Sequence, residues 1–187
     1  MNKKIGIIFL LFFISLFFAG CATWQMVGAQ NQWKCDKLEA TLPEGWMRLN
    51  LTADLLFLTK DGEWLQSIRI FRFKTGNDKA LPISKKKFTE EMLPQEISDL
   101  LVNEMSLDSN RLNFEVKENV PCAIGTKDGF KLQFTYNTAD HLKLKDILYG
   151  FKLDKYVYII QYQAAQQHYF DKDVADFEAF MESFRVF

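Results

Sequence analysis

The chain has 187 residues, of which 48% are hydrophobic and 15% aromatic, and its formal net charge at pH 7 is −1. A chain of this length can bury one sizeable hydrophobic core, so these numbers predict a single domain. The charge balance argues against nucleic acid as a partner, because binding to nucleic acid requires a basic surface.

The first twenty residues have the three parts of a secretory signal: a basic start, an apolar middle and small residues before a cleavage point. The apolar stretch from Ile5 to Phe18 has about fourteen residues, whereas a membrane-spanning helix needs about twenty. We therefore expect a signal peptide at 1–20, a short tether at 21–32 and one folded domain at 33–187. Without residues 1–20, 21 Lys and Arg stand against 24 Asp and Glu, which is a net charge of −3.

The segment Phe18-Ala19-Gly20-Cys21 resembles the bacterial lipobox, with Phe18 at the position where that family usually has Leu. The resemblance implies that the thiol of Cys21 receives a diacylglycerol and that the new amine is acylated, for example with palmitate. Two or three acyl chains make membrane attachment stable. Ala22 follows the cysteine, which in a Gram-negative bacterium implies the outer membrane, with the domain facing the periplasm. A retained membrane anchor and cleavage without lipid are the alternatives.

Two further cysteines, Cys35 and Cys122, remain for the folded domain. The bacterial envelope is oxidising, so this pair can form a disulfide that closes a loop of nearly ninety residues. The alternative is two separate buried thiols that pack as small hydrophobic groups. The chain has no Cys-x-x-Cys motif, which argues against a redox catalyst.

Three strands are predicted in the first half of the domain, at 33–42, 53–59 and 64–73. The first ends at the turn signal Pro43-Glu44-Gly45. The other two are expected to form a hairpin, because Asp-Gly between apolar runs favours a tight turn. A helix is predicted from Pro94 to about Ser106, since its apolar residues share one face and proline suits the first helical position.

The second half is mostly strand, with predicted elements at 112–120, 123–126, 130–138, 144–153 and 156–165. Turns are expected at 127–129 and 154–155, and Pro121 indicates an edge strand or a bulge. The last strand begins with a run that is apolar on both faces, so it is expected at the centre of the sheet. A second amphipathic helix is predicted from about Asp173, capped by Asp171 or Asp173. These elements predict an antiparallel α+β domain with about six or seven strands and two helices.

Three segments resemble the PsbP-like superfamily, which includes the extrinsic photosystem II subunit, a Ran-binding nuclear import factor and bacterial envelope lipoproteins of the DcrB type. They are Leu42-Pro43-Glu44-Gly45-Trp46, the pair Tyr158-x-x-x-Tyr162, and Phe177-x-x-Phe180-x-x-Ser183-Phe184. The resemblance implies an antiparallel sheet sandwiched between helices (α/β/α), and a non-enzymatic adaptor. It carries no catalytic residue over, and Trp46 is expected to pack in the core.

The sequence offers little for catalysis or metal binding. Its two histidines, His141 and His168, lack the spacing of a zinc helix, and no nucleophile elbow or phosphate loop occurs. We therefore expect no cofactor and no metal ion. The basic run Lys85-Lys86-Lys87 can contact anionic lipid headgroups, although a solvated helix entry is the simpler explanation.

The expected function is a lipid-anchored envelope domain that binds a protein partner or another envelope component and is not an enzyme. Two alternatives remain. A carrier of a small apolar ligand or lipid requires a deep apolar pocket, and a hydrolase requires His141 or His168 beside a nucleophile.

Overall fold

The computed structural model describes residues 24–50 and 52–187. The predicted signal peptide and the lipidation site Cys21 lie outside these residues. Within the described ranges, no helix combines the length and the apolar character needed to cross a membrane.

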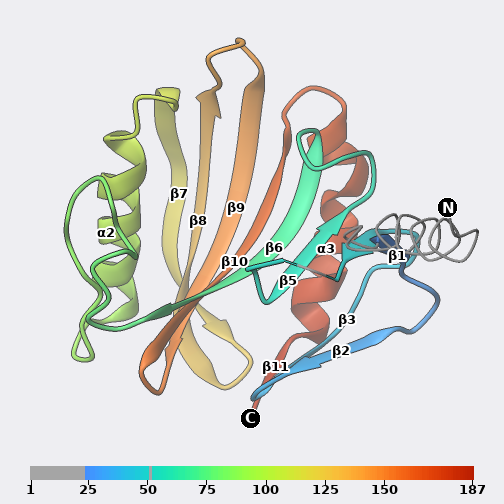
Figure 1. Cartoon of the computed structure of the whole chain (residues 1–187), viewed down its shortest axis with the longest axis horizontal. Coiled ribbons are helices and arrows are strands. Elements are labelled where there is room, and N and C mark those ends of the chain that lie inside the picture. Colours follow the sequence, from blue (N-terminus) through green and yellow to red (C-terminus); the bar gives the residue numbers. More distant parts are fainter. Residues whose placement is uncertain (1–23, 51) are drawn as a thin grey trace, which may run out of the picture.

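The core of the domain is one antiparallel sheet of eight strands (Figure 1). In spatial order its strands are β1 (Trp24–Met26), β4 (Met47–Leu49), β5 (Leu56–Thr59), β6 (Gln66–Lys74), β10 (Tyr156–Ala165), β9 (Lys143–Leu153), β8 (Lys127–Asn137) and β7 (Leu112–Ile124). The antiparallel α+β class is confirmed, but the sheet is larger than the six or seven predicted strands. The additional members β1 and β4 have three residues each, which is too short for a hydrophobic alternation to be recognised.

A second sheet of three strands replaces the single strand predicted at 33–42, which was wrong. The segment is a tight hairpin of β2 (Gln32–Cys35) and β3 (Leu38–Thr41), and β11 (Arg185–Val186) pairs with β3. The turn lies at Asp36, whose φ of 51° is in the left-handed region that Asp tolerates better than most residues. The sequence has no Gly or Pro at this turn, so the hairpin has no strong local signal.

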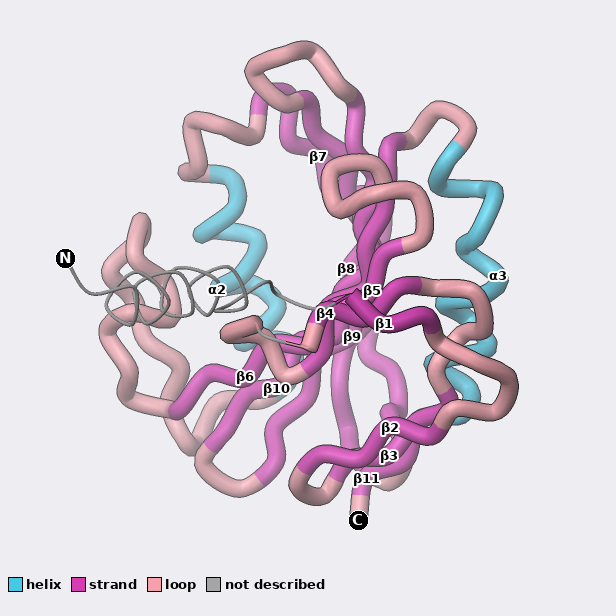
Figure 2. The backbone as a smooth tube through the Cα atoms, turned by 45° about the vertical axis from the view of Figure 1, so that its right-hand side comes forward, coloured by secondary structure: helices cyan, strands magenta, loops and turns pink. Residues whose placement is uncertain are grey.

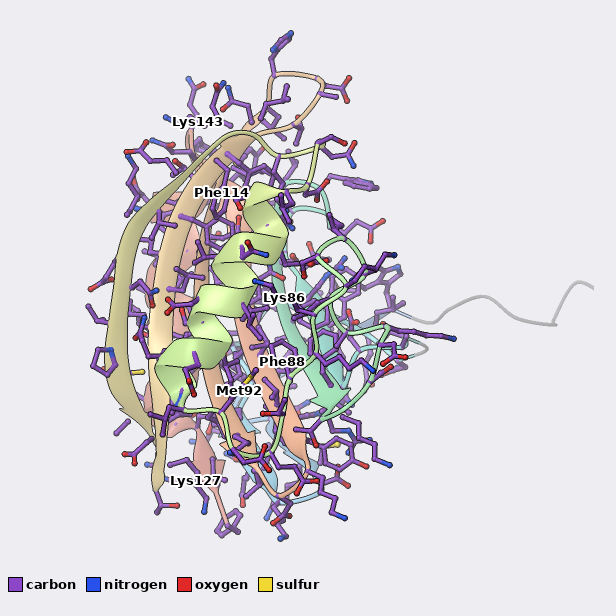
Figure 3. All side chains as sticks on the ribbon, turned by 90° about the vertical axis from the view of Figure 1, so that its left-hand side faces the viewer. Lys86, Phe88, Met92, Phe114, Lys127 and Lys143 are labelled. Carbon is purple, nitrogen blue, oxygen red and sulfur yellow. The ribbon has the colours of Figure 1, made fainter. Side chains whose placement is uncertain are left out.

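Two helices cover opposite faces of the large sheet (Figure 2). Helix α3 (Tyr169–Ser183) packs with Trp46, Tyr162 and other apolar side chains on one face, and α2 (Pro94–Ser106) covers a second cluster on the other. Figure 3 shows α2 across its face of the sheet, with the segment that carries Lys86, Phe88 and Met92 alongside the helix. Strand β10 is central and largely buried on both faces, as predicted.

The ends of α2 agree with the prediction, whereas those of α3 do not. Pro94 is the first residue of α2, and the Glu96 carboxylate accepts a hydrogen bond of 2.7 Å from the backbone N–H of Leu93. Helix α3 begins at Tyr169, four residues before the predicted start. No side chain caps its N-terminus, so the capping role predicted for Asp171 or Asp173 was wrong.

Asp173 instead fixes α3 to the sheet. Its carboxylate accepts hydrogen bonds from Lys60 at 2.6 Å and from Gln66 at 2.7 Å, and the residue is buried. Burial alone would raise the pKa of Asp173, but the bonds from Gln66 and Lys60 outweigh this effect and lower the pKa. A partly buried ion pair that also accepts a hydrogen bond from the buried Gln66 side-chain nitrogen holds the helix in one position on the sheet.

The long strands of the second half join at two tight turns. β7 runs without interruption through Pro121 as an edge strand with two irregularities in register, which confirms the predicted edge or bulge. Proline is tolerated there because an edge strand has one side without ladder hydrogen bonds. The turn predicted at 127–129 was placed too late: it lies at Gly125, which has φ 57°. The turn at Asp154 is as predicted.

Candidate functional site: a pocket at one end of the sheet

At one end of the large sheet, loops and strands enclose a hollow of about 470 Å³, which we call the end pocket. The strand register brings the beginnings of β6, β7 and β9 together with the ends of β8 and β10 at this end. It is the upper end in Figure 1, marked by the hairpin between β8 and β9. Its volume is typical of ligand sites. Three connections and three strands line it, with Trp64, Asp108, Arg111, Tyr136, Leu142 and Gln163 among the contributing residues.

The floor of the end pocket is a hydrogen-bonded chain on the α2 side of the sheet. The Gln163 side-chain Nε2 donates to the hydroxyl of Tyr136 at 2.8 Å and to the carboxylate of Asp146 at 3.1 Å. Gln161, two residues earlier on β10, also donates to Asp146. Side chains two apart on a strand share a face, which explains why both glutamines reach the same carboxylate from β10.

Asp146 lies beneath the pocket and has no exposed surface. It forms no salt bridge within the described residues. Burial raises the pKa of Asp146 from 3.8 to about 7, against the partial opposition of the two glutamine amides and the charge of Arg111. A buried, unpaired carboxyl that titrates near neutral pH costs stability, and such groups concentrate at functional sites.

Arg111 forms one wall of the pocket. Its Nε lies 3.3 Å from a carboxylate oxygen of Asp108, and its guanidinium carbon lies 4.6 Å from the centre of the Tyr136 ring. Its Nη1 is buried and has no hydrogen-bond partner among the described residues. Burial is also the main reason why the pKa of Tyr136 is raised to about 12, so its hydroxyl keeps its proton at neutral pH.

Trp64 stands at the rim of the pocket, in the turn between β5 and β6, and is 81% exposed. A tryptophan with so little packing contributes little to the folded state, because the hydrophobic effect scales with the apolar area removed from water. Exposed tryptophans at the edge of a pocket are typical contact residues for a partner.

Three further hollows of about 330 to about 420 Å³ lie elsewhere on the surface. The hollow at the opposite end of the sheet is lined by ion pairs of Lys37 with Asp154 and of Arg72 with Asp36. Its charged groups already satisfy one another, whereas the end pocket combines an exposed aromatic side chain with a partly unsatisfied polar floor. The end pocket is therefore the better candidate site.

The residues of the family-like motifs have structural roles. Trp46 has no exposed surface, as expected, and its indole N–H donates to Asp176 on α3 at 2.9 Å. Tyr162 is buried under the same helix and donates from its hydroxyl to the carbonyl of Phe170 at 3.0 Å. The motif of α3 places Phe177 and its neighbours in the core, so none of these residues lines the end pocket.

Cys35 and Cys122 are both free thiols, so the disulfide that the sequence allowed is not formed. Cys35 ends β2 in the small sheet, whereas Cys122 lies on β7 at the far edge of the large sheet. Each is half-buried against the α3-side core, in accord with the alternative of two separate packed thiols. Burial is the main cause that raises the pKa of both thiols.

The run Lys85-Lys86-Lys87 lies in the segment before α2, and all three residues are exposed. Lys87 pairs with Asp78, and the two other lysines form no ion pair within the described part of the chain. The segment is ordered because the Glu104 carboxylate on α2 accepts two backbone hydrogen bonds of 2.8 Å from the residues just before the run. Contact with an anionic surface stays a prediction.

His141 lies in the turn between β8 and β9, and His168 precedes α3. Neither side chain forms a hydrogen bond to a described residue, so no histidine–nucleophile pair is present there. No group of three or more His, Cys, Asp or Glu that could hold a metal ion was found in 24–50 and 52–187.

Sequence reasoning missed the residues of the end pocket. A partial signal exists in Asp146, Gln161 and Gln163, which are polar residues inside otherwise apolar strands. Buried polar groups in a central strand must be satisfied by one another, and this requirement could have linked the three. Trp64 and Arg111 come from connections distant in the sequence, and only the strand register brings them to the same end.

No protein-family model matches the chain, and no curated protein sequence matches it. Its fold is similar to several solved structures. The solution structure of cyanobacterial PsbP (CyanoP) from Synechocystis aligns with a TM-score of 0.58 and 14% identity, over 91% of this chain and 96% of that one. LpqN, involved in cell envelope biogenesis of Mycobacterium tuberculosis, aligns with a TM-score of 0.50 and 10% identity, over 90% of this chain and 87% of that one.

A mutant of Mog1 is also similar, with a TM-score of 0.51 and 11% identity over 83% of this chain and 96% of that one. At such low identity these likenesses concern the fold alone. They do not extend to the DcrB type that the sequence motifs also resemble, and that finer assignment stays a prediction. The comparisons and the architecture agree on one conclusion: the chain has a PsbP-like fold.

Proposed function

We propose that this protein is a lipid-anchored accessory domain of the bacterial envelope, that it binds its partner in the end pocket, and that it is not an enzyme. The observation that carries the proposal is the pocket itself. It combines a hollow of about 470 Å³, a rim tryptophan that is 81% exposed and a polar floor. The description of LpqN as a protein of envelope biogenesis supports the same setting.

The arrangement of the pocket favours binding over catalysis. Asp146, whose pKa of about 7 would suit a general acid or base, lies under the floor without exposed surface. The lining residue that is hydrogen-bonded to Asp146 is Gln163, whose amide neither attacks a substrate nor transfers a proton at neutral pH. The hydrolase alternative therefore has no supporting arrangement in the described residues.

The carrier alternative also loses support. Each of the four hollows opens to solvent, and the space between the sheet and either helix is filled by core side chains. A deep apolar pocket, which this alternative requires, is not among them.

The lipid anchor at Cys21 is part of the proposal, as is an assignment to the DcrB type of envelope lipoproteins. Metabolic labelling with an alkyne analogue of palmitate tests the anchor. The wild-type protein should incorporate label and fractionate with the outer membrane, and the Cys21→Ser variant should do neither. Labelling of the variant at the wild-type level would contradict the anchor without affecting the assignment of the pocket.

Site-specific photo-crosslinking tests the pocket as the binding site. A photoreactive phenylalanine analogue, which keeps an aromatic ring at the rim, replaces Trp64 in the full-length protein in cells, and a matched control replaces Phe187, an exposed aromatic residue (71%) at the opposite end of the sheet. We expect a discrete adduct from position 64 that is absent from position 187. Adducts of equal yield from both positions, or none from either, would contradict the proposal.

A further inference from the structure

The floor of the end pocket offers a ligand two hydrogen-bonding groups that the protein does not use. Tyr136 accepts a hydrogen bond from Gln163, and no described residue accepts one from its hydroxyl. The side-chain oxygen of Gln163 accepts no hydrogen bond within the described residues and is not among the buried unsatisfied atoms, so it keeps exposed surface, and Gln163 is one of the residues that line the pocket. The floor thus presents one O–H donor and one carbonyl acceptor.

Asp146 fixes which end of the Gln163 amide faces the pocket. The amide nitrogen of Gln163 lies 3.1 Å from the Asp146 carboxyl and 2.8 Å from the Tyr136 hydroxyl and donates to both, so the amide oxygen is turned away from them. The donor and the acceptor are also close together, because the Tyr136 hydroxyl lies 2.8 Å from the nitrogen of the same amide. A ligand that uses both must carry an acceptor and a donor side by side.

This requirement selects among neutral ligands. The adjacent hydroxyl groups of a sugar ring provide an acceptor and a donor on the same side. A trans peptide group does not, because its N–H and C=O point in opposite directions. The floor therefore suits a vicinal diol better than the backbone of an extended peptide.

The charges of the pocket disfavour ionic ligands. Its lining carries two carboxylates, Asp108 and Asp140, and one guanidinium, Arg111. That guanidinium is committed to Asp108 and to the Tyr136 ring, and its unpartnered Nη1 is buried and does not face the hollow. An anionic ligand would meet net negative charge. A quaternary ammonium group would need several free aromatic faces. Arg111 covers the ring of Tyr136, so Trp64 is the one aromatic ring of the lining that is still free.

Trp64 completes the match to a sugar. Its flat ring at the rim is free, and two leucines, Leu142 and Leu144, supply further apolar lining. A pyranose has an apolar face of C–H groups and an edge of hydroxyls, so it can pack on an aromatic ring while its hydroxyls reach polar side chains.

We propose that the end pocket binds a neutral carbohydrate, with two adjacent hydroxyls on the Tyr136 hydroxyl and the Gln163 carbonyl and with a ring face on Trp64. This inference rests on the proposed function, since it names the ligand class of the same pocket. Asp146 acts as a positioning residue that keeps the acceptor of Gln163 directed at the ligand.

Saturation-transfer NMR on the full-length protein in a detergent without a sugar headgroup tests the proposal. The probes are cellobiose, maltose and chitobiose, which differ in linkage and substituents, with phosphocholine and inorganic phosphate as charged competitors. We expect transfer to at least one disaccharide, no transfer to phosphocholine, and no loss of the disaccharide signal when inorganic phosphate is added. The Tyr136→Phe variant, which removes one hydroxyl, should weaken binding about five- to tenfold. Trp64→Ala should abolish transfer, and Trp24→Ala, at a 43% exposed tryptophan on β1, should leave it unchanged.

Three results would overturn the inference: no transfer to any disaccharide, equal transfer in the Trp64→Ala and wild-type proteins, or displacement of the sugar by phosphocholine or phosphate. A discrete cross-link from position 64 together with no sugar binding would leave the pocket as the binding site and refute the ligand class. Failure of both experiments would refute the proposed function as well. Circular dichroism of each variant separates loss of binding from loss of fold.

Discussion

Replacing Asp146 by asparagine should make the protein more stable at neutral and alkaline pH. Burial raises the pKa of Asp146 from 3.8 to about 7, so the folded protein holds a proton that the unfolded chain releases near pH 4. A carboxyl with a raised folded-state pKa lowers stability progressively as the pH rises from about 4 to about 7, and the loss is constant above that range. The full effect corresponds to about 4 kcal/mol.

Asparagine has nearly the same shape, cannot ionise, and offers an oxygen that can still accept hydrogen bonds from Gln161 and Gln163. The free energy of unfolding of the wild type should therefore fall relative to that of Asp146→Asn by about 2.5 kcal/mol between pH 5 and pH 8. Urea denaturation at pH 5, 6, 7 and 8, followed by circular dichroism, measures this difference. Asp140→Asn, at an exposed residue of the same pocket, is the matched control and should show no such trend.

A difference between wild type and Asp146→Asn that does not change with pH would refute the reasoning. It would mean that the carboxyl ionises as freely in the folded protein as in the unfolded chain.

Three further predictions concern the rest of the fold. A Cβ atom at Gly150 would lie 2.1 Å from the buried Phe130 ring, so Gly150→Ala should lower the free energy of unfolding by about 1–3 kcal/mol in urea denaturation. Asp173→Ala removes the shortest hydrogen bonds of Lys60 and of Gln66, leaves both donors only contacts of 3.3–3.5 Å, and should cost about 2 kcal/mol at pH 7. Because the pKa of this carboxyl is lowered, the cost should shrink as the pH falls through that pKa. In denaturant, a thiol reagent should detect both Cys35 and Cys122 as free thiols. In the folded protein at pH 7 both should react slowly with the same reagent, because burial raises the pKa of each thiol. If two fewer thiols react in denaturant than expected, the two cysteines are bridged.

The elements that sequence reasoning recovered are those with strong periodicity or clear punctuation. Helix α2 has an apolar stripe and a proline at its first position, and β10 is a long apolar run bounded by a tight turn. Hydrophobic burial dictates these elements locally, so they can be recognised without knowledge of the tertiary structure.

The errors occurred where tertiary contacts override local signals. Asp171 and Asp173 resemble caps of α3, but Asp173 is required as the acceptor for Lys60 and Gln66, which lie more than a hundred positions away in the sequence. The small sheet depends on β11, a two-residue strand that has no pattern of its own. Such partners become visible only when the chain is folded.

The end pocket was hidden for a related reason. Its rim, wall and floor come from Trp64, Arg111 and Gln163, which share no motif and follow one another in the sequence at intervals of about fifty positions. The register of the paired strands, which no local sequence pattern encodes, brings these three residues to the same end of the sheet. Only the polar residues inside β9 and β10 gave a hint, and they identify the floor without indicating the opening above it.

Hydrogen exchange on the protein in its native membranes, compared with the purified protein in detergent, tests the central claim most directly because it requires no knowledge of the partner. If the end pocket is the binding site, amides in the turns at 60–65 and 138–142 should exchange more slowly in the membranes. Amides in the turns at 36–37 and 154–155, at the opposite end of the sheet, should exchange equally in both samples. Protection confined to the opposite end, or no difference at either end, would contradict the account.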